Sequence, residues 1–173
     1  MAQKIAERLV WAVETLAVDP TDHLLEIGCG HGVAVSLICD RLTGGKITAI
    51  DRSEVMVTMA RSRNRRHVVS GKAVIQTVAL AEADFGNEQF NKIFAINVSL
   101  FWQQPARELG LIKRLLTPEG AVYLFHQPPL ASKTQEVADK LTKILQDHSF
   151  SINEVLLKDL KAVPAVCLIA EAS

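Results

Sequence analysis

An apolar stretch, His23–Ile27, runs directly into three glycines spaced two residues apart, Gly28, Gly30 and Gly32. Glycine lacks a Cβ, so its backbone can adopt positive φ values and approach a ligand more closely than other residues. A helix predicted from Val33 would point its free N–H groups and the positive end of its dipole at the same turn. The pattern therefore predicts a strand, a ligand-binding turn and a helix, although a turn that binds nothing would have the same pattern.

An aspartate follows the glycines at an informative distance. After the predicted helix 33–42, the Gly44-Gly45 turn leads into a second predicted strand, Lys46–Ile50, which ends at Asp51. In a βαβ unit, an acidic residue about 20 residues after the glycines lies beside the first turn and can accept hydrogen bonds from ribose hydroxyls. The alternative is that Asp51 only caps the next helix. The two features together favour a nucleotide site.

Two segments of this region resemble a known protein family. Residues 26–32 read Glu-Ile-Gly-Cys-Gly-His-Gly, and residues 51–60 read Asp-Arg-Ser-Glu-Val-Met-Val-Thr-Met-Ala. In these segments the chain is similar to class I S-adenosylmethionine-dependent methyltransferases of the small, type 11-like kind, and the similarity extends from about Asp22 to Gly120. A dehydrogenase fingerprint would read Gly-x-Gly-x-x-Gly, but Val33 stands in place of its third glycine, so an NAD(P)-dependent oxidoreductase is the less favoured alternative.

The resemblance implies an α/β fold. Its expected form is a three-layer, doubly wound, Rossmann-like arrangement around a seven-stranded, mostly parallel sheet of order 3-2-1-4-5-7-6, with strand 7 antiparallel. The sequence supports the antiparallel end, because the link 158–164 between the last two predicted strands, 151–157 and 165–171, is too short for a parallel crossover. The remaining predicted strands are Ala73–Val78, Lys92–Asn97 and Ala121–His126, the last of them after a turn at 117–120.

Helical periodicity and capping residues place the helices between these strands. Ser53 is a capping residue for a helix that runs to about Arg63, and Ser132 with Gln135 predicts a capping box for the last helix. A further helix is predicted over 105–116. The first helix has an apolar face made of Ile5, Leu9, Ala12, Val13 and Leu16.

Composition limits the classes of partner and compartment. The chain has 173 residues, of which 49% are hydrophobic, so we expect a single domain over residues 1–173 with the helix in 1–20 covering the site. Its formal net charge is zero, which gives no general attraction to nucleic acid or to a membrane. The absence of a signal peptide and of a long apolar run predicts a cytoplasmic protein. Its three cysteines are expected to be free thiols, and no metal is expected.

The resemblance also implies a set of cofactor contacts. The chain departs from the family at Ala79, where relatives commonly have an aspartate for the adenine amino group. The N–H of Leu80, or the side chain of Glu82 or Asp84 after a loop shift, could replace that contact. Met56 is equally well explained as core packing. The residues implied to contact S-adenosylmethionine are Glu26, Gly28, Cys29, Gly30, Gly32, Asp51, Arg52, Met56, Ala79, Leu80 and Asn97.

Catalytic residues are predicted from strand ends. Trp102 follows the strand that ends at Asn97, and His126 ends the neighbouring strand, where it could act as a base if the acceptor carries a proton. With Ser99, Phe101 and Gln127 they would form the acceptor pocket, and Trp11 would be its movable cover. Core packing remains the alternative for these side chains and is preferred for Trp11.

The predicted activity is methyl transfer to a small-molecule acceptor that the sequence does not identify. The motif at Asn97 is not Asn-Pro-Pro-Tyr, which argues against methylation of nucleic-acid bases, and the basic segment Arg61–His67 is more typical of a solvated patch. The alternative, favoured by Ala79, is a methyltransferase-like cofactor-binding module that depends on a partner subunit. The sequence leaves open whether the protein is a homodimer.

Overall fold

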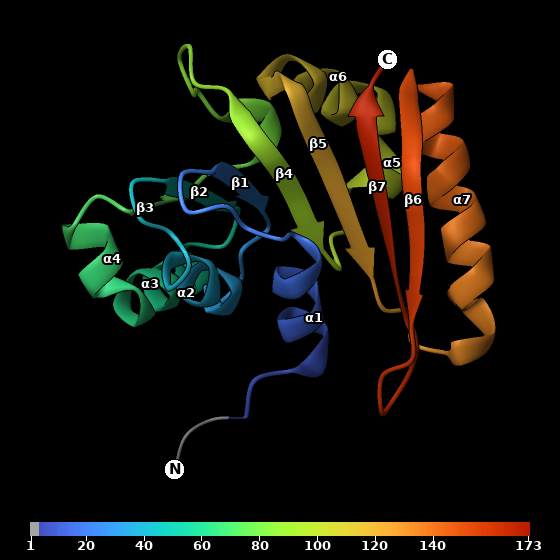
Figure 1. Ribbon diagram of the computed structural model, residues 1–173, viewed down its shortest axis with the longest axis horizontal. Helices are drawn as coiled ribbons and strands as arrows, with labels where there is room; N and C mark the ends of the chain where they lie inside the picture. Colours follow the sequence, from blue (N-terminus) through green and yellow to red (C-terminus); the bar gives the residue numbers. More distant parts are fainter. Residues whose placement is uncertain (1–3) are drawn as a thin grey trace.

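Seven strands form one sheet in the computed structural model, which describes residues 4–173. The strand order is β3-β2-β1-β4-β5-β7-β6, and β7 is antiparallel to both of its neighbours while the other pairs are parallel (Figure 1). This confirms the predicted fold class and strand order. The strands are β1 His23–Ile27, β2 Lys46–Asp51, β3 Ala73–Thr77, β4 Phe90–Ile96, β5 Leu116–His126, β6 Phe150–Lys158 and β7 Ala165–Ala172.

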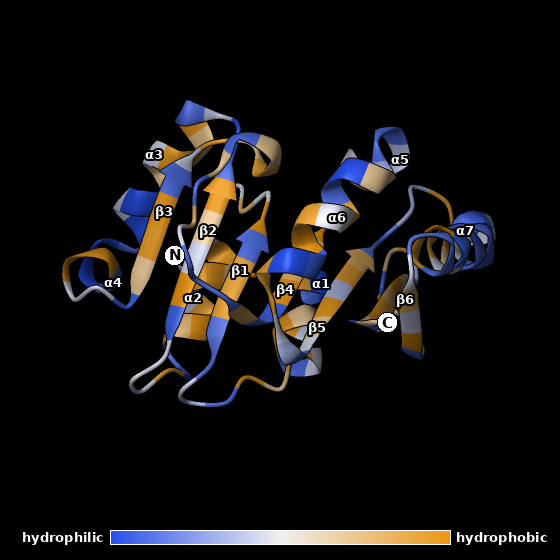
Figure 2. Ribbon diagram, turned by 90° about the horizontal axis from the view of Figure 1, so that it is seen from above, coloured by the Kyte–Doolittle hydropathy of each residue, from blue (hydrophilic) through white to orange (hydrophobic). Residues whose placement is uncertain are grey.

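Helices cover the two faces of the sheet and enclose a core on each. Leu24 of β1 belongs to a core cluster that includes residues of α1, α2 and α3, whereas Leu25 belongs to a second cluster that includes residues of α6 and α7. The central parallel strands β1, β2 and β4 have runs of consecutive buried residues, as strands between two helical layers require, and Figure 2 shows apolar residues along them. The helices are α1 Glu7–Thr15, α2 Val33–Cys39, α3 Glu54–Arg63, α4 Arg65–Val69, α5 Leu100–Gln103, α6 Pro105–Leu115 and α7 Thr134–Asp147, with 3₁₀ turns at Leu80–Glu82 and Ala131–Lys133.

The start of β5 differs from the prediction. We expected a turn at 117–120, but the strand begins at Leu116, directly after α6. Its pairing with β4 shifts register between Phe90 and Lys92. A Cβ at Gly120 would lie 2.9 Å from the carbonyl oxygen of Phe90, so glycine here allows close approach of the strands and does not mark a turn.

The two predicted serine caps have different outcomes. The side chain of Ser53 accepts a hydrogen bond from the Met56 N–H (3.3 Å), which confirms the cap of α3. The capping box at Ser132 is wrong: this residue lies inside a 3₁₀ turn, and α7 begins after Lys133 without a side-chain cap among the described residues. The Lys133 N–H already bonds to the Leu130 carbonyl (3.0 Å), which moves the start of α7 past the serine.

We expect Ser53→Ala to lower the free energy of unfolding by about 1 kcal/mol, because one N–H of the first turn of α3 loses its acceptor. Urea denaturation at neutral pH measures this change. Ser132→Ala is the matched control and should change the free energy by less than about 0.5 kcal/mol. Equal losses of unfolding free energy in both variants would contradict the conclusion that Ser53 caps a helix and Ser132 does not.

Three further expectations can be compared with the fold. Cys29, Cys39 and Cys167 are buried free thiols, as predicted. In α1, Ala12, Val13 and Leu16 are buried, whereas Ile5 is 41% exposed. Within residues 4–173, no helix is both long and apolar enough to span a bilayer.

Candidate active site

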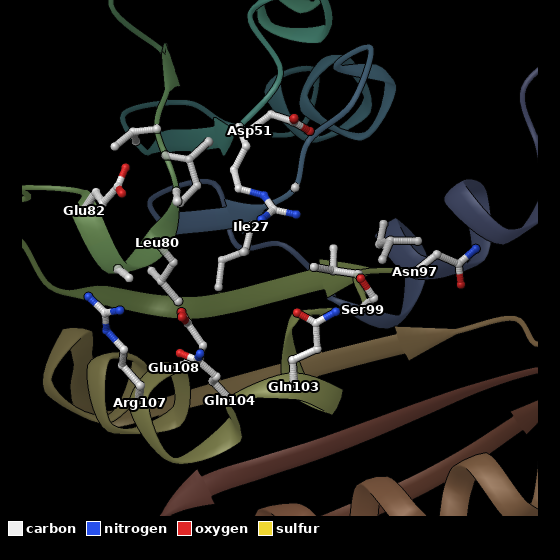
Figure 3. Close-up of a pocket in the computed structure, with 18 residues that line it drawn as sticks. Ile27, Asp51, Leu80, Glu82, Asn97, Ser99, Gln103, Gln104, Arg107 and Glu108 are labelled. Atoms are coloured by element: carbon white, nitrogen blue, oxygen red, sulfur yellow. The ribbon is translucent and has the colours of Figure 1, made fainter.

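The carboxyl ends of β1, β2 and β4 meet at one edge of the sheet, where they border a cavity of about 490 Å³ (Figure 3). Ligands of doubly wound sheets bind at this edge, because the loops there diverge and leave a crevice. One wall carries Gly28, Asp51 and Arg52, and the opposite wall is formed by α5 and the start of α6. The loop after β3, residues 78–82, lines the end of the cavity.

The glycine turn approaches the cavity with its backbone. Gly28, Gly30 and Gly32 all have positive φ, at 75°, 51° and 74°. The N–H groups of Gly28 and Cys29 donate to the carbonyl of Ile50 (2.8 and 3.0 Å), which fixes the turn against the end of β2. A Cβ on Gly28 would lie 2.7 Å from Val98 Cγ2, so no side chain fits there without displacing the segment after β4.

Asp51 links the turn to α3. Its Oδ2 accepts a hydrogen bond from the Gly30 N–H and its Oδ1 accepts one from the Ser53 N–H, both at 2.9 Å. The carboxylate therefore contacts both the glycine turn and the start of α3, so Asp51 is not only a cap of that helix. Each oxygen keeps a second lone pair, and Asp51 lines the cavity (Figure 3), so it can still accept hydrogen bonds from a ligand.

Glu26 precedes the turn and Cys29 is part of it, and both lie outside the cavity lining. Glu26 is 3% exposed, and its Oε2 has no hydrogen-bond partner among the described residues. Burial, and secondarily the charge of Asp51, raise the pKa of this carboxyl to about 8. Burial likewise raises the pKa of the Cys29 thiol, which makes it a poor nucleophile and supports a packing role.

Asn97 joins the ends of β4 and β5. Its φ is 55°, its N–H donates to the carbonyl of Phe125 (2.9 Å), and its Oδ1 accepts from the Gln127 N–H (2.7 Å). These bonds hold the backbone of the segment after β4 beside the glycine turn. Asn97 and Ser99 both line the cavity.

The predicted cofactor residues fall into three groups. Those that line the cavity are Gly28, Asp51, Arg52, Ala79, Leu80 and Asn97. Those that lie outside the cavity lining are Cys29, Gly30 and Gly32, which are part of the turn, and Glu26, which precedes it. Met56 does neither: it is half-buried on α3, and its N–H is engaged by the Ser53 cap.

The predicted catalytic pair lies apart from this cavity. The rings of Trp102 and His126 meet edge to face at 5.7 Å, and the Lys140 Nζ lies 4.7 Å from the centre of the Trp102 ring. Both residues border a separate small pocket of about 10 Å³ together with the buried Phe101. Burial lowers the pKa of His126, which keeps its ring neutral at physiological pH. Their catalytic role stays a prediction.

Trp11, the expected cover of the acceptor pocket, also lies apart from the large cavity. Trp11 packs edge-on against Phe125 at 5.6 Å, in agreement with its preferred core role. In the part of the chain that the structure describes, α1 contributes no residue to the lining of the large cavity. Arg8 and Trp11 instead line a separate small pocket together with Asn97 and His126.

Sequence reasoning missed the wall formed by α5 and α6. Gln103, Gln104, Arg107 and Glu108 line the cavity, and Gln103 points toward Ser99 (Figure 3). Glu108 is 4% exposed, and burial raises the pKa of its carboxyl. A signal was present, because Glu108 lies four residues before Ile112 and therefore on the buried face of the helix.

The fold and the cavity define a nucleotide-binding α/β protein, and comparison with known proteins specifies its family. A family model described as a methyltransferase domain matches residues 24–120. The uncharacterized methyltransferase YdaC of Bacillus subtilis is 25% identical over 166 residues, which cover 93% of this chain and 89% of that protein. Trans-aconitate 2-methyltransferase of Escherichia coli O157:H7 is 33% identical over 124 residues, which cover 68% of this chain and 45% of that protein.

A solved structure agrees with the fold. A SAM-dependent methyltransferase from Aquifex aeolicus matches with a TM-score of 0.77 at 17% identity, covering 94% of this chain and 88% of that one. The chain belongs to the methyltransferase domain family, and its cofactor is S-adenosylmethionine. This confirms the resemblance and the predicted cofactor, and it decides against an oxidoreductase.

The site fits this cofactor in two respects. Gly28 presents backbone without a side chain to the cavity, its missing Cβ leaving room for the Val98 side chain, and Asp51 lines the cavity with acceptor oxygens suited to hydroxyl groups. Glu26 precedes the same turn, but it adds no charge there at neutral pH, because its carboxyl, with a pKa raised to about 8, keeps its proton.

Proposed function

We propose that this protein transfers the methyl group of S-adenosylmethionine to a small-molecule acceptor bound in the cavity described above. The observation that carries the proposal is the composition of that cavity. Its glycine turn and Asp51 are suited to the cofactor, while Ser99, Gln103 and Gln104 line the other side. A volume of about 490 Å³ lies in the range of roughly 300–1,000 Å³ that is usual for small-ligand sites.

The contribution of the protein would be positional. When bound, the cofactor supplies a methyl group on a positively charged sulfur, which is a good leaving group. Gly28 gives it backbone access, Asp51 is proposed to hold the ribose hydroxyls, and the segment after β4 is proposed to hold the methionine end. Asn97 keeps that segment in place through its bonds to β5, so that acceptor and methyl carbon can align.

A proton acceptor is needed only if the acceptor atom carries a proton. His126 remains the proposed base and Trp102 the proposed acceptor contact, although both lie across Val98 from the large cavity. A neutral His126 ring can accept a proton near pH 7. These roles require the small pocket beside them to open toward the cofactor.

Two observations support a small acceptor. The related enzyme from Escherichia coli acts, by its name, on trans-aconitate, a small carboxylic acid. Two arginines of the basic segment 61–67 make internal contacts: Arg61 bonds to the carbonyl of Ile75, and Arg66 pairs with Asp40 at 2.9 Å. These contacts restrain the guanidinium groups that a nucleic-acid footprint would need.

An assay of S-adenosylhomocysteine release tests the proposal. We expect turnover with at least one member of a panel of small carboxylic acids and hydroxylated compounds, trans-aconitate included. Transfer only to RNA, DNA or protein, with a steep dependence on salt, would contradict it. Tight cofactor binding without transfer to any acceptor, relieved by adding a partner protein, would favour the partner-dependent module.

A further inference from the structure

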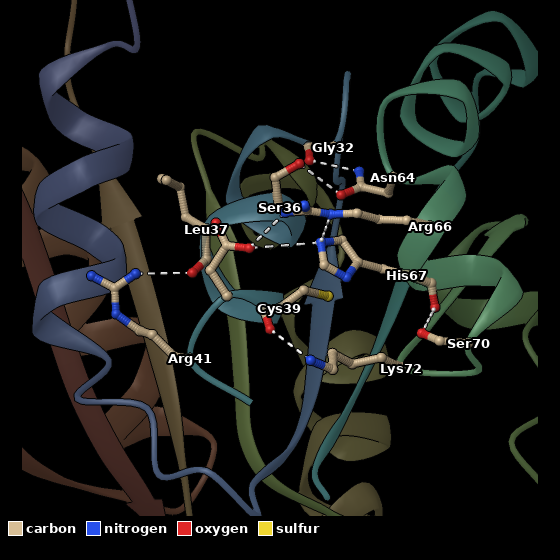
Figure 4. Close-up of polar contacts among 11 residues, drawn as sticks. Gly32, Ser36, Leu37, Cys39, Arg41, Asn64, Arg66, His67, Ser70 and Lys72 are labelled. Carbon is tan, nitrogen blue, oxygen red and sulfur yellow. Dashed lines mark hydrogen bonds and ion pairs between the residues drawn. The ribbon is translucent and has the colours of Figure 1, made fainter. Parts of the chain in front are cut away.

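A buried asparagine connects the end of α3 to the glycine turn. Asn64 follows α3 directly and is 0% exposed. Its Nδ2 donates to the carbonyls of Gly32 and Ala60, both at 2.9 Å, and its Oδ1 accepts from the Ser36 hydroxyl at 2.7 Å (Figure 4). The side-chain amide thus uses both N–H groups and its oxygen within the protein.

The contact between the turn and α3 is unusually close. Gly32 is the N-cap of α2 and has a φ of 74°. A Cβ there would lie 2.7 Å from Asn64 Nδ2 and 2.8 Å from Ala60 Cβ, so the backbone of the turn rests directly on the end of α3. The neighbouring Arg63 donates from Nε to the carbonyl of His31 (3.1 Å). Consecutive side chains therefore hold consecutive carbonyls of the turn.

The turn is consequently tied to both ends of α3. At the beginning of the helix, Asp51 binds the N–H groups of Gly30 and Ser53; at its end, Asn64 binds Gly32. The Gly32 carbonyl also accepts from the Ser36 N–H (3.2 Å), and the Ala60 carbonyl from the Asn64 N–H (3.0 Å). These backbone acceptors would remain satisfied without the Asn64 side chain, so the side chain mainly fixes where the turn lies.

We infer that Asn64 is a positioning residue for cofactor binding: it sets the place of Gly32, and with it the path of the glycine turn over the cavity. The inference rests on the proposed cofactor site at that turn. A displacement of the turn would move the N–H groups of the first turn of α2 and the backbone at Gly28. Small displacements of binding groups are costly, since affinity depends on groups being held in place before the ligand arrives.

Calorimetric titration with S-adenosylmethionine tests the role of Asn64. We expect Asn64→Ala and the nearly isosteric Asn64→Asp to raise the dissociation constant by about 10-fold or more, because both lack the amide donor to Gly32. Ser36→Ala is the matched control: it removes the third hydrogen bond of Asn64 but not the bond to Gly32. Its dissociation constant should stay within about 2-fold of the parent value.

All titrations are made on protein that circular dichroism shows to be folded. A purely structural role would lower the melting temperature of the Asn64 variants and leave the dissociation constant of the folded protein unchanged, which would overturn the inference. If the parent does not bind S-adenosylmethionine, both the proposed cofactor site and the positioning role of Asn64 fail. If the parent binds and the Asn64 variants bind equally well, only the positioning role fails.

Two exposed arginines, Arg63 and Arg65, allow a second test if the Asn64 variants do not fold. Arg63→Ala removes the bond to the His31 carbonyl and should raise the dissociation constant by about 2- to 3-fold. Arg65→Ala makes the same charge change two residues away and should leave binding unchanged. Equal effects of the two substitutions would indicate a general charge effect and contradict the positional coupling.

Discussion

Replacing Asp51 by alanine is expected to raise the dissociation constant for S-adenosylmethionine by about 10- to 150-fold, or about 1.4 to 3 kcal/mol of binding free energy. Two effects act in the same direction. The proposed acceptor of the ribose hydroxyls is lost, and the Gly30 N–H loses the carboxylate oxygen that it contacts at 2.9 Å. Isothermal titration calorimetry of parent and variant measures the change.

Two further variants separate charge from geometry. Asp51→Asn keeps the size of the side chain, but only one of its two terminal atoms is an oxygen that can accept hydrogen bonds. We therefore expect an intermediate loss of affinity for S-adenosylmethionine. Asp147→Ala removes a carboxylate that pairs with Lys143 on α7, far from the glycine turn (Figure 1), and should leave binding unchanged. Parent-like affinity of Asp51→Ala would place the cofactor elsewhere.

Glu26 is expected to make the protein less stable as the pH rises. Its pKa is about 8 in the folded state against 4.5 for the free side chain, so between these values the folded protein holds a proton that the unfolded chain has released. Stability therefore falls as pH increases through this window. Between pH 5.5 and pH 8 the parent should lose on the order of 3 kcal/mol through Glu26 alone.

The variant Glu26→Gln cannot titrate and should lack this loss. Urea denaturation of both proteins at pH 5.5 and pH 8 gives the difference in pH dependence. His67 and His126, whose pKa values are lowered by burial, act in the opposite direction, but they are common to both proteins and cancel in the comparison. Identical pH profiles for parent and variant would contradict the shifted pKa.

A buried carboxyl without a hydrogen-bond partner lowers the stability of the folded protein, and a purely structural role would not explain its presence. Local conflicts of this kind are typical of functional sites, where binding matters more than stability. Glu26 lies two residues before Gly28 and interacts electrostatically with Asp51. Its position behind the proposed cofactor turn is consistent with that account.

The sequence by itself determined the fold and predicted that the glycine turn and Asp51 lie together, as they do in the structure. The apolar strand before Gly28 and the acidic end of the next strand are local patterns, and each lies within a few residues of the element it defines. The short link between β6 and β7 required their antiparallel pairing for an equally local reason. Residues 26–32 and 51–60 were sufficient to indicate the methyltransferase family, which the family match confirmed.

Only the tertiary structure decided which distant side chains meet. It brought Asn64 against Gly32, placed Glu108 in the cavity wall, and separated Trp102 and His126 from that cavity by Val98. These outcomes depend on how α3 packs on α2 and on how α5 and α6 cross the sheet. Spacing along the chain determines which face of an element a residue occupies, but the packing of whole helices determines what lies opposite that face, and that information is not local in the sequence.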